Sequence, residues 1–524
     1  MITINRNLII MISAMVVLNS CSEDFITTTP PSVLSEANYY QNISELETGL
    51  NSCYSIVNHY FYSWWWGQHL PTILSVIGNM GSDGSEAGGG TGGGFIENFG
   101  GEISVSAQNS SNVLVMFWWQ INFELIARCN LVIDKSAQMP EDTNPIELEK
   151  LVDQAKFLRA FAYYNLVTIF GDVPLPTSWL NPDELNLERS SDSLVWIQIE
   201  NDLADASNLP PQSKSQRGRA TQGAVLAMQG KVFLWQKKYS EAIEAYESVI
   251  QSGEYQLMDE YGDIHHPDGE NCRESIFEFQ EENGVTGGDM ASCLGICRLP
   301  RDELVGGWGC DTPSQDLFEE FEPGDPRIIY TFNFIGDIFP HPNSQYTVQN
   351  LDSQTGYTCR KAWIPFRYRP ESGNLPAYNW RYCRYAEVLL FYAEALNEAE
   401  PRQPEEAKEY LNMVRKRARL SSLDDPERDS CVWDLSISGE RLPDVVTSDQ
   451  SELRQAIWHE QRVELATEGH RRWILLRTGR LKERMEAAKG HLGCVVDDHE
   501  WLYPIPWEEV GASNGLITQN PGYN

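Results

Sequence analysis

A dense group of aromatic residues near the N-terminus is the first candidate for chemistry. The segment 59–67, HYFYSWWWG, places six aromatic side chains in nine residues. Flat aromatic rings pack on the C–H faces of pyranose sugars, so this segment predicts a carbohydrate-stacking platform. The alternative is that the rings fill the core or a subunit interface, because Trp is usually well buried. The candidate stacking residues are Tyr62, Trp64, Trp65 and Trp66.

Aromatic rings and arginines also gather in the segment 333–369. A ring beside a guanidinium group would suit a sugar that carries a carboxylate or a sulfate, through stacking and paired hydrogen bonds. The alternative is a pair of strands that packs on helices. The arginines of this segment are Arg360, Arg367 and Arg369. The candidate binding residues of this segment are Tyr346, Trp363 and Arg367, and Trp308, upstream of it, is a further candidate.

Motifs of enzymes do not stand out in the chain. The sequence has no nucleophile elbow, phosphate-binding loop or zinc-protease motif, and nothing singles out a carboxylate pair for glycoside hydrolysis among its 75 acidic residues. The segment 265–270, HHPDGE, gathers potential metal ligands, but Pro267 and Gly269 indicate a turn in which such side chains are solvated. We therefore expect no catalytic residue, no bound metal and no cofactor.

The N-terminal residues have the pattern of an export signal. An apolar run from Leu8 to Leu18 is too short to span a bilayer about 30 Å thick, so we interpret residues 1–20 as a signal peptide. The following cysteine completes a sequence that resembles a bacterial lipobox, which implies that Cys21 is acylated, with palmitate for example, and anchors the protein. The acidic residues after it resemble a surface-export tag. Residues 21–35 contain two prolines and predict a tether.

Ten cysteines remain when Cys21 is set aside, an even number in an exported protein. Disulfide bonds are chemically allowed there, and the spacing Cys293-x-x-x-Cys297 could close a small ring. Free, half-buried thiols are an equally good interpretation.

Net charge excludes one class of partner. The 40 basic and 75 acidic residues give a formal charge of −35, and a field of this sign repels phosphate backbones. We therefore expect no nucleic-acid partner. With 524 residues, of which 41% are hydrophobic, the chain has ample material for a large folded core.

The elements that would position these candidate residues are helices packed in pairs. Residues 221–236 leave no wholly polar face, which predicts a buried helix, and a second helix is predicted from Ser240, as its N-cap, to Gly253. Small residues let the two backbones approach closely, and the pair resembles a tetratricopeptide repeat. One such unit cannot bury both faces, so we expect others. The small residues are Ala227, Gly230 and Ala242.

Three segments break the helical pattern and predict long irregular insertions. They are 59–101, which is rich in glycine, 282–309 and 333–369. Binding residues are disproportionately found on loops that a rigid scaffold positions, so we expect the ligand site in these insertions.

Several motifs resemble those of the SusD/RagB family of surface glycan-binding lipoproteins. A helix that ends in Phe170-Gly171-Asp172 and is followed by Val173-Pro174-Leu175 resembles a signature of that family. The chain departs from the family pattern at Gln461 and Ile474, where Arg and Asp are usual, and both positions look structural. Further matches, in the order of the family, are Glu274–Glu278, Gly307–Gly309, Asp325–Arg327, Arg384–Leu390, Glu460–Arg477, Tyr503–Pro506 and Gln519–Tyr523.

The resemblance implies a lipid-anchored protein of the outer membrane, exposed at the cell surface, that binds an oligosaccharide or polysaccharide. It implies delivery of that glycan to a SusC-like TonB-dependent transporter, without catalysis. In the family Trp308 belongs to an ordinary Gly-Trp-Gly, so a structural role is its alternative. Two other functions stay open: a tetratricopeptide-like structural subunit of the transporter complex without its own sugar site, and a glycoside hydrolase.

We therefore predict a mostly α fold. A scaffold of tetratricopeptide-like helix pairs, at about 150–257 and 383–477, carries long irregular loop insertions and a few short strands. Residues 36–524 are expected to form a single domain.

Overall fold

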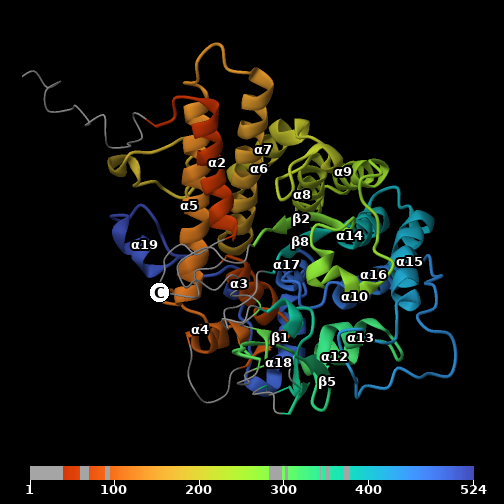
Figure 1. The fold of residues 1–524 in the computed structure, drawn as a ribbon. Coiled ribbons are helices and arrows are strands. Elements are labelled where there is room, and N and C mark those ends of the chain that lie inside the picture. Colours follow the sequence, from red (N-terminus) through yellow and green to blue (C-terminus); the bar gives the residue numbers. More distant parts are fainter. Residues whose placement is uncertain are drawn as a thin grey trace, which may run out of the picture.

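The computed structural model describes residues 39–58, 70–88, 95–281, 295, 298–300, 305–342, 344–349, 353, 355–369 and 378–523. Helices dominate these residues, and every strand is short (Figure 1). The predicted mostly α fold is confirmed. Of the helices in this part of the chain, none is long and apolar enough to span a lipid bilayer.

Long helices of the first half of the chain pack side by side (Figure 1). Asn112 caps α5, because its side chain accepts hydrogen bonds from the N–H groups of Leu114 and Val115. The longest of these helices, α6, ends at Gly171, whose φ of 70° is readily adopted only by glycine. These helices are α2 (Ile43–Asn58), α5 (Val113–Ser136), α6 (Pro145–Phe170) and α7 (Asp192–Asp205).

The predicted helix pair is α8 (Gln222–Trp235) and α9 (Tyr239–Gln251). A Cβ atom at Gly230 would lie 2.3 Å from the ring of Tyr246, so the close approach of the two helices requires glycine there. The predicted N-cap was wrong: α9 begins at Tyr239, and Ser240 lies inside its first turn. Lys237 takes a positive φ of 59°, so the turn between the two helices ends there and Lys238, not Ser240, is the N-cap of α9.

A second set of helices forms the C-terminal half, where α14 packs on α9, α15 and α16. Gln461 is fully buried, and its amide donates to the Glu394 carboxylate at 2.7 Å, so an amide takes the place of the family's usual arginine. Ile474 is also buried. The helices are α14 (Tyr385–Glu398), α15 (Pro404–Leu420), α16 (Gln450–Glu464), α17 (Arg471–Arg477), α18 (Leu481–Lys489) and α19 (Trp507–Ala512).

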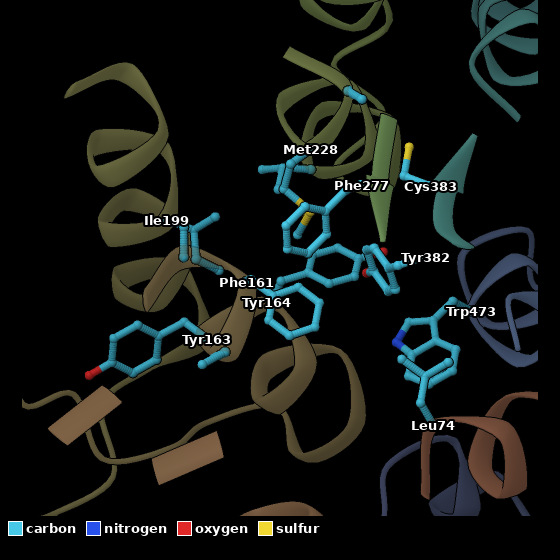
Figure 2. Packing of buried hydrophobic residues seen from close by; sticks show 14 of the residues in the cluster. Leu74, Phe161, Tyr163, Tyr164, Ile199, Met228, Phe277, Tyr382, Cys383 and Trp473 are labelled. Atoms are coloured by element: carbon cyan, nitrogen blue, oxygen red, sulfur yellow. The ribbon is translucent and has the colours of Figure 1, made fainter. Parts of the chain in front are cut away.

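Apolar and aromatic side chains fill the space between these helices (Figure 2). Strand β2 (Ser275–Phe279) pairs antiparallel with β8 (Trp380–Arg384), and all ten residues of the two strands are buried. Phe161 of α6 meets Tyr382 of β8 edge to face, with ring centroids 5.1 Å apart. The two-stranded ladder is therefore a layer of the helical core.

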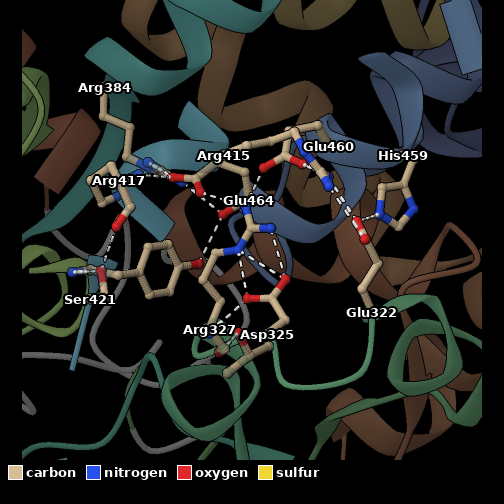
Figure 3. Close-up of polar contacts among 12 residues, drawn as sticks. Glu322, Asp325, Arg327, Arg384, Arg415, Arg417, Ser421, His459, Glu460 and Glu464 are labelled. Carbon is tan, nitrogen blue, oxygen red and sulfur yellow. Dashed lines mark hydrogen bonds and ion pairs between the residues drawn. The ribbon is translucent and has the colours of Figure 1, made fainter. Parts of the chain in front are cut away.

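Charged side chains fill a second buried region beside α15 and α16 (Figure 3). Glu464 at the end of α16 accepts hydrogen bonds from Arg327, Arg384 and Arg417, and all four residues are buried. Burial would raise the pKa of the Glu464 carboxyl, but the three guanidinium groups hold that pKa well below its ordinary value. We call this group, with Glu274, Glu460 and Glu468, the ionic layer.

The prediction of irregular structure throughout 59–101 was wrong for part of that segment. Residues 70–80 form α3 (Leu70–Ser75) and the π-helical turn η3 (Val76–Met80), and α4 spans Phe95–Ser104. The physical reason is apolar packing, since Ile73 and Ile77 are fully buried. The aromatic segment itself, with Tyr62, Trp64, Trp65 and Trp66, lies outside the described residues, as does Cys21.

Smaller elements connect the helices. The segment 265–270 forms a turn, as predicted, but the expectation of solvated side chains was wrong for His265, which is buried. Among the described residues, no group of acidic, His or Cys side chains could hold a metal ion. All eight described cysteines are free thiols, whereas Cys293 and Cys297 lie outside the described residues. The short helices are α10 (Tyr261–Ile264), α12 (Gln315–Glu320), α13 (Arg327–Thr331) and the turns Pro182–Glu184, Ala206–Asn208, Gln212–Lys214, Pro267–Gly269, Phe366–Tyr368, Gly490–Leu492 and Asp498–Trp501.

Candidate functional site

A strand of the first insertion pairs with the strand that follows the second insertion. Strand β1 (Ser85–Ala87) pairs antiparallel with β3 (Asp311–Pro313), although more than 220 residues separate the strands in sequence. The Gly88 N–H continues this ladder by donating to the Cys310 carbonyl oxygen at 2.8 Å. A Cβ atom at Gly88 would lie 2.0 Å from the Gly309 carbonyl oxygen, so this approach requires glycine.

The third insertion packs against the second. It consists of two hairpin-like ladders, β4 (Phe332–Phe334) with β7 (Tyr357–Cys359) and β5 (Ile338–His341) with β6 (Ser344–Thr347). A small hydrophobic cluster joins the two insertions, and β1 and β5 lie at the same lower end of the molecule in Figure 1. The cluster contains Leu299 and Val305 from the second insertion and Phe339, Tyr346, Val348, Trp363 and Phe366 from the third.

Two predicted sugar-contact residues lie inside this cluster. Tyr346 is 2% exposed and Trp363 is 1% exposed. The Trp363 ring stacks on Phe339 at 4.1 Å and lies nearly parallel to Tyr346 at 5.9 Å, so protein covers its faces. Insertions without long helices need a core of their own, and these rings supply it. In this structure Tyr346 and Trp363 hold the insertions together, and a sugar does not reach their faces.

Trp308 lies at the junction of the insertions. It is half-buried and packs against the main core. Its neighbours fix it by close backbone contact: the Gly309 N–H donates to the Leu299 carbonyl oxygen at 2.9 Å, and a Cβ atom at Gly307 would lie 2.2 Å from that same oxygen. The Gly-Trp-Gly sequence therefore has a structural reason, because both glycines lie against the Leu299 carbonyl oxygen.

Arg367 is exposed, but its charge is balanced. Its guanidinium group bonds to the Glu427 carboxylate and lies 4.7 Å above the Tyr368 ring. Arg360 pairs with Asp425 at 2.6 Å, and Arg369 donates to the carbonyl oxygens of Ile364 and Val305. Burial lowers the pKa of the Arg369 guanidinium to about 10. All three groups are engaged by the protein, which does not favour the predicted acidic or sulfated sugar.

A cavity of about 290 Å³ opens beside Arg367. Four segments far apart in the sequence line it, so no local pattern predicted it, and its side chains include Glu260, His266, Tyr330, Lys361 and Glu427. Burial lowers the pKa of the Lys361 ammonium to about 8, and this group donates to Glu468 of the ionic layer at 2.7 Å. The lining can hydrogen-bond hydroxyl groups, and each cation in it faces a carboxylate.

The chain resembles proteins of one family over its whole length. A sequence model of the SusD family matches residues 273–523, and a model described as "Starch-binding associating with outer membrane" matches residues 102–234. SusD-like proteins P2 and P38 of Formosa agariphila are each 25% identical to this chain; the match to P2 covers 97% of both chains, and the match to P38 covers 97% of this chain and 96% of P38.

Solved structures share the fold. A laminarin-binding SusD-like protein is 26% identical, with a TM-score of 0.73, over 92% of this chain and all of that chain. Surface glycan-binding protein A from Bacteroides thetaiotaomicron, solved in complex with laminarihexaose, has a TM-score of 0.73 at 22% identity, over 91% of this chain and 99% of that chain. The two sequence models together match more than half of the chain, and its relatives match it from end to end: the chain belongs to the SusD family.

Proposed function

We propose that this protein binds a glycan at the outer surface of an outer membrane and delivers it to a TonB-dependent transporter, without catalysis. The observation that carries the proposal is the full-length likeness, at 26% identity, to a protein described as laminarin-binding. The convergence of the three insertions supports it, because it gives loops from distant parts of the chain a common, rigid base.

The glycan in this proposal is neutral. The net charge of −35 opposes an anionic chain, and Arg360 and Arg367 are already paired with carboxylates. Stacking on aromatic rings and hydrogen bonds to hydroxyl groups need no net charge. Laminarin and laminarihexaose are the first probes, with a sulfated polysaccharide as the comparison.

The proposed contact residues are Trp308 at the junction and the aromatic group of the first insertion, Tyr62, Trp64, Trp65 and Trp66. Isothermal titration calorimetry of the mature protein against these probes tests the proposal. Single replacements by Ala should weaken binding by about 1–3 kcal/mol where a ring stacks on sugar, at an unchanged melting temperature. Absence of binding across neutral and acidic glycans would overturn glycan capture.

Delivery requires a membrane anchor and a partner. In this proposal acylated Cys21 holds the protein at the membrane, so Cys21→Ala should move it from the membrane fraction to the soluble fraction. Purification of the anchored protein from its native membrane should retain a TonB-dependent transporter. A wild-type protein that binds glycan but never co-purifies with a transporter would refute the delivery step.

A second candidate function is a structural subunit of the transporter complex without its own sugar site. The burial of Tyr346 and Trp363 favours it, because two of the predicted contact rings act as core. This alternative predicts a stable complex with the transporter and identical glycan affinity for the transporter alone and for the complex.

A further inference from the structure

A patch of partly exposed apolar side chains lies outside the contact residues proposed above. Ile335 is 52% exposed, Val432 is 54% exposed and Trp433 is 39% exposed. Residues 430–433 run alongside residues 334–338, which begin at the end of β4: the Trp433 ring stacks on Phe334, and a Cβ atom at Gly336 would lie 3.1 Å from Val432. Ser430 and Ile338 exchange backbone hydrogen bonds, and the Val432 N–H donates to the Asp337 carboxylate at 3.0 Å.

Packing from below fixes the orientation of the Trp433 ring. The indole stacks on Phe334 with ring centroids 5.4 Å apart and an angle of 13°, and it meets Phe318 edge to face at 4.9 Å. Phe318 in turn stacks on Tyr357 at 4.8 Å. Since Phe334 covers one face of the indole, its exposed surface belongs to the opposite face and edge. A ring held in this way loses little conformational freedom on binding a ligand.

Polar side chains lie beside Tyr357, at one edge of this ring cluster. The Tyr357 hydroxyl donates to the Gln315 side chain at 3.0 Å, and the amide of Gln315 donates to Glu319 at 2.8 Å. Gln315, Glu319 and Asp434 are all exposed. An exposed aromatic face beside amide and carboxylate groups offers what a pyranose requires, namely stacking for its C–H face and acceptors for its hydroxyl groups.

We propose that Trp433 is a second carbohydrate-stacking platform, separate from the residues assigned above, which binds a pyranose ring of the same neutral polysaccharide. This inference rests on the proposed function. The patch is small for a protein partner, because three partly exposed side chains provide far less than the roughly 800 Å² per partner of a standard protein interface. Its size suits one or two sugar rings.

The platform is continuous with the meeting point of the insertions. Helix α12, which carries Phe318, follows β3 directly, and the Ser314 N–H between them donates to the Gly84 carbonyl oxygen at 3.0 Å. Strand β4, which carries Phe334, pairs with β7 of the third insertion. A linear polysaccharide held at the insertions can therefore continue over Trp433, whereas a short oligosaccharide occupies one site. Two weak contacts on one chain raise the apparent affinity for the polymer.

The test compares three variants with laminarin and laminarihexaose as probes. Trp433→Ala should bind laminarin about tenfold more weakly than wild type, with a smaller change for the hexasaccharide. Trp433→Phe, which keeps a flat ring, should retain most of the affinity. The matched control is Trp507→Ala, since Trp507 is 56% exposed on α19 and lies outside the patch (Figure 1); its affinity should equal that of wild type.

Each result separates this inference from the proposed function. If wild type binds laminarin and Trp433→Ala binds it equally well, the second platform is refuted and glycan capture stands. Loss of transporter co-purification by Trp433→Ala at unchanged glycan affinity also refutes it and assigns the patch to a protein partner. If wild type binds no glycan, both proposals fail. Melting temperatures near that of wild type show that Trp433→Ala is folded.

Discussion

Two buried regions of this molecule are held together by different chemistry. Around α6, α8 and the ladder of β2 and β8, buried apolar and aromatic side chains pack against one another (Figure 2). In the ionic layer, Glu464 alone accepts hydrogen bonds from three arginines (Figure 3). The first region joins helix to helix, whereas the second joins α16 to a turn, a strand end and an insertion.

The difference follows from what each region must satisfy. Regular helices bond their own backbone groups and need only matching apolar surfaces. The ends of elements present irregular surfaces and unpaired groups, and the planar fork of Arg reaches them with several donors of fixed direction. Lys361 extends the ionic layer into the third insertion through Glu468. Directional contacts therefore fix the base of the loops in which we place the ligand site.

The largest expected effect comes from removing the centre of the ionic layer. Glu464→Ala leaves Arg327, Arg384 and Arg417 buried with less compensation, which should lower the free energy of unfolding by about 3–5 kcal/mol. Denaturant unfolding followed by circular dichroism measures it. Glu405→Ala is the control, because Glu405 pairs with Lys408 at 2.9 Å on an exposed surface, and it should leave the unfolding midpoint unchanged. Equal effects of the two replacements would remove the distinction between buried and exposed charge.

A smaller effect tests the apolar region. Gly230→Ala places a Cβ atom 2.3 Å from the Tyr246 ring, so the α8–α9 contact must open, at a cost of about 1–3 kcal/mol. Thermal unfolding of the two proteins at low and high salt should show the same loss, since no charge is involved. Gly490→Ala, where the new Cβ atom meets nothing within 4 Å, is the control. A neutral Gly230→Ala would show that the helix pair is loosely packed.

The smallest effect is a dependence on pH at the outer edge of the ionic layer. Burial lowers the pKa of His459, but hydrogen bonds to Glu320 and Glu322 raise that pKa from 6.5 to about 9. The carboxyl groups shift in the opposite direction, since burial raises the pKa of each but His459 and nearby arginines lower both to about 2. His459 therefore contributes stability that is complete below pH 6.5 and is lost as the pH rises through 9.

Unfolding between pH 6 and pH 10 measures this contribution, which we expect to be about 1–2 kcal/mol because the groups are partly exposed. The carboxylates of Glu320 and Glu322 contribute in the acid range: the stability that they supply is complete above pH 4.5 and is lost as the pH falls through 2. His459→Gln should flatten the alkaline slope and also weaken the acid dependence, because His459 lowers the pKa of both Glu320 and Glu322. An unchanged alkaline slope in that variant would assign the dependence to other groups.

Local patterns in the sequence predicted the scaffold well. The apolar faces of α8 and α9, the small residues between them and the stop at Gly171 all act within one or two helical turns, which is the range that a pattern can report. The errors have the same origin. Glycine in the segment 59–101 indicated an irregular loop, but burial of Ile73 and Ile77 stabilises the helical structure of α3 and η3. Tertiary packing outweighed local preference there.

The candidate site was less predictable. Counting aromatic residues led to Tyr346 and Trp363, which are buried, because composition does not tell which face of a ring is covered. The same method missed Trp433, a single aromatic residue in a segment without periodicity. Trp433 is a candidate because its ring stacks on Phe334, about 100 residues away in sequence. Tyr62 and Trp64–Trp66 stay a prediction.

The sequence by itself determined the family, the helical scaffold and the glycines at close backbone contacts, because each depends on residue type at short spacing. Only the tertiary structure decided that the three insertions converge, that Arg360 and Arg367 are paired with carboxylates, and which aromatic faces are exposed. These properties depend on contacts between segments tens to hundreds of residues apart. The free energy of such contacts comes from the burial and complementarity of both partners, and neither partner alone encodes them.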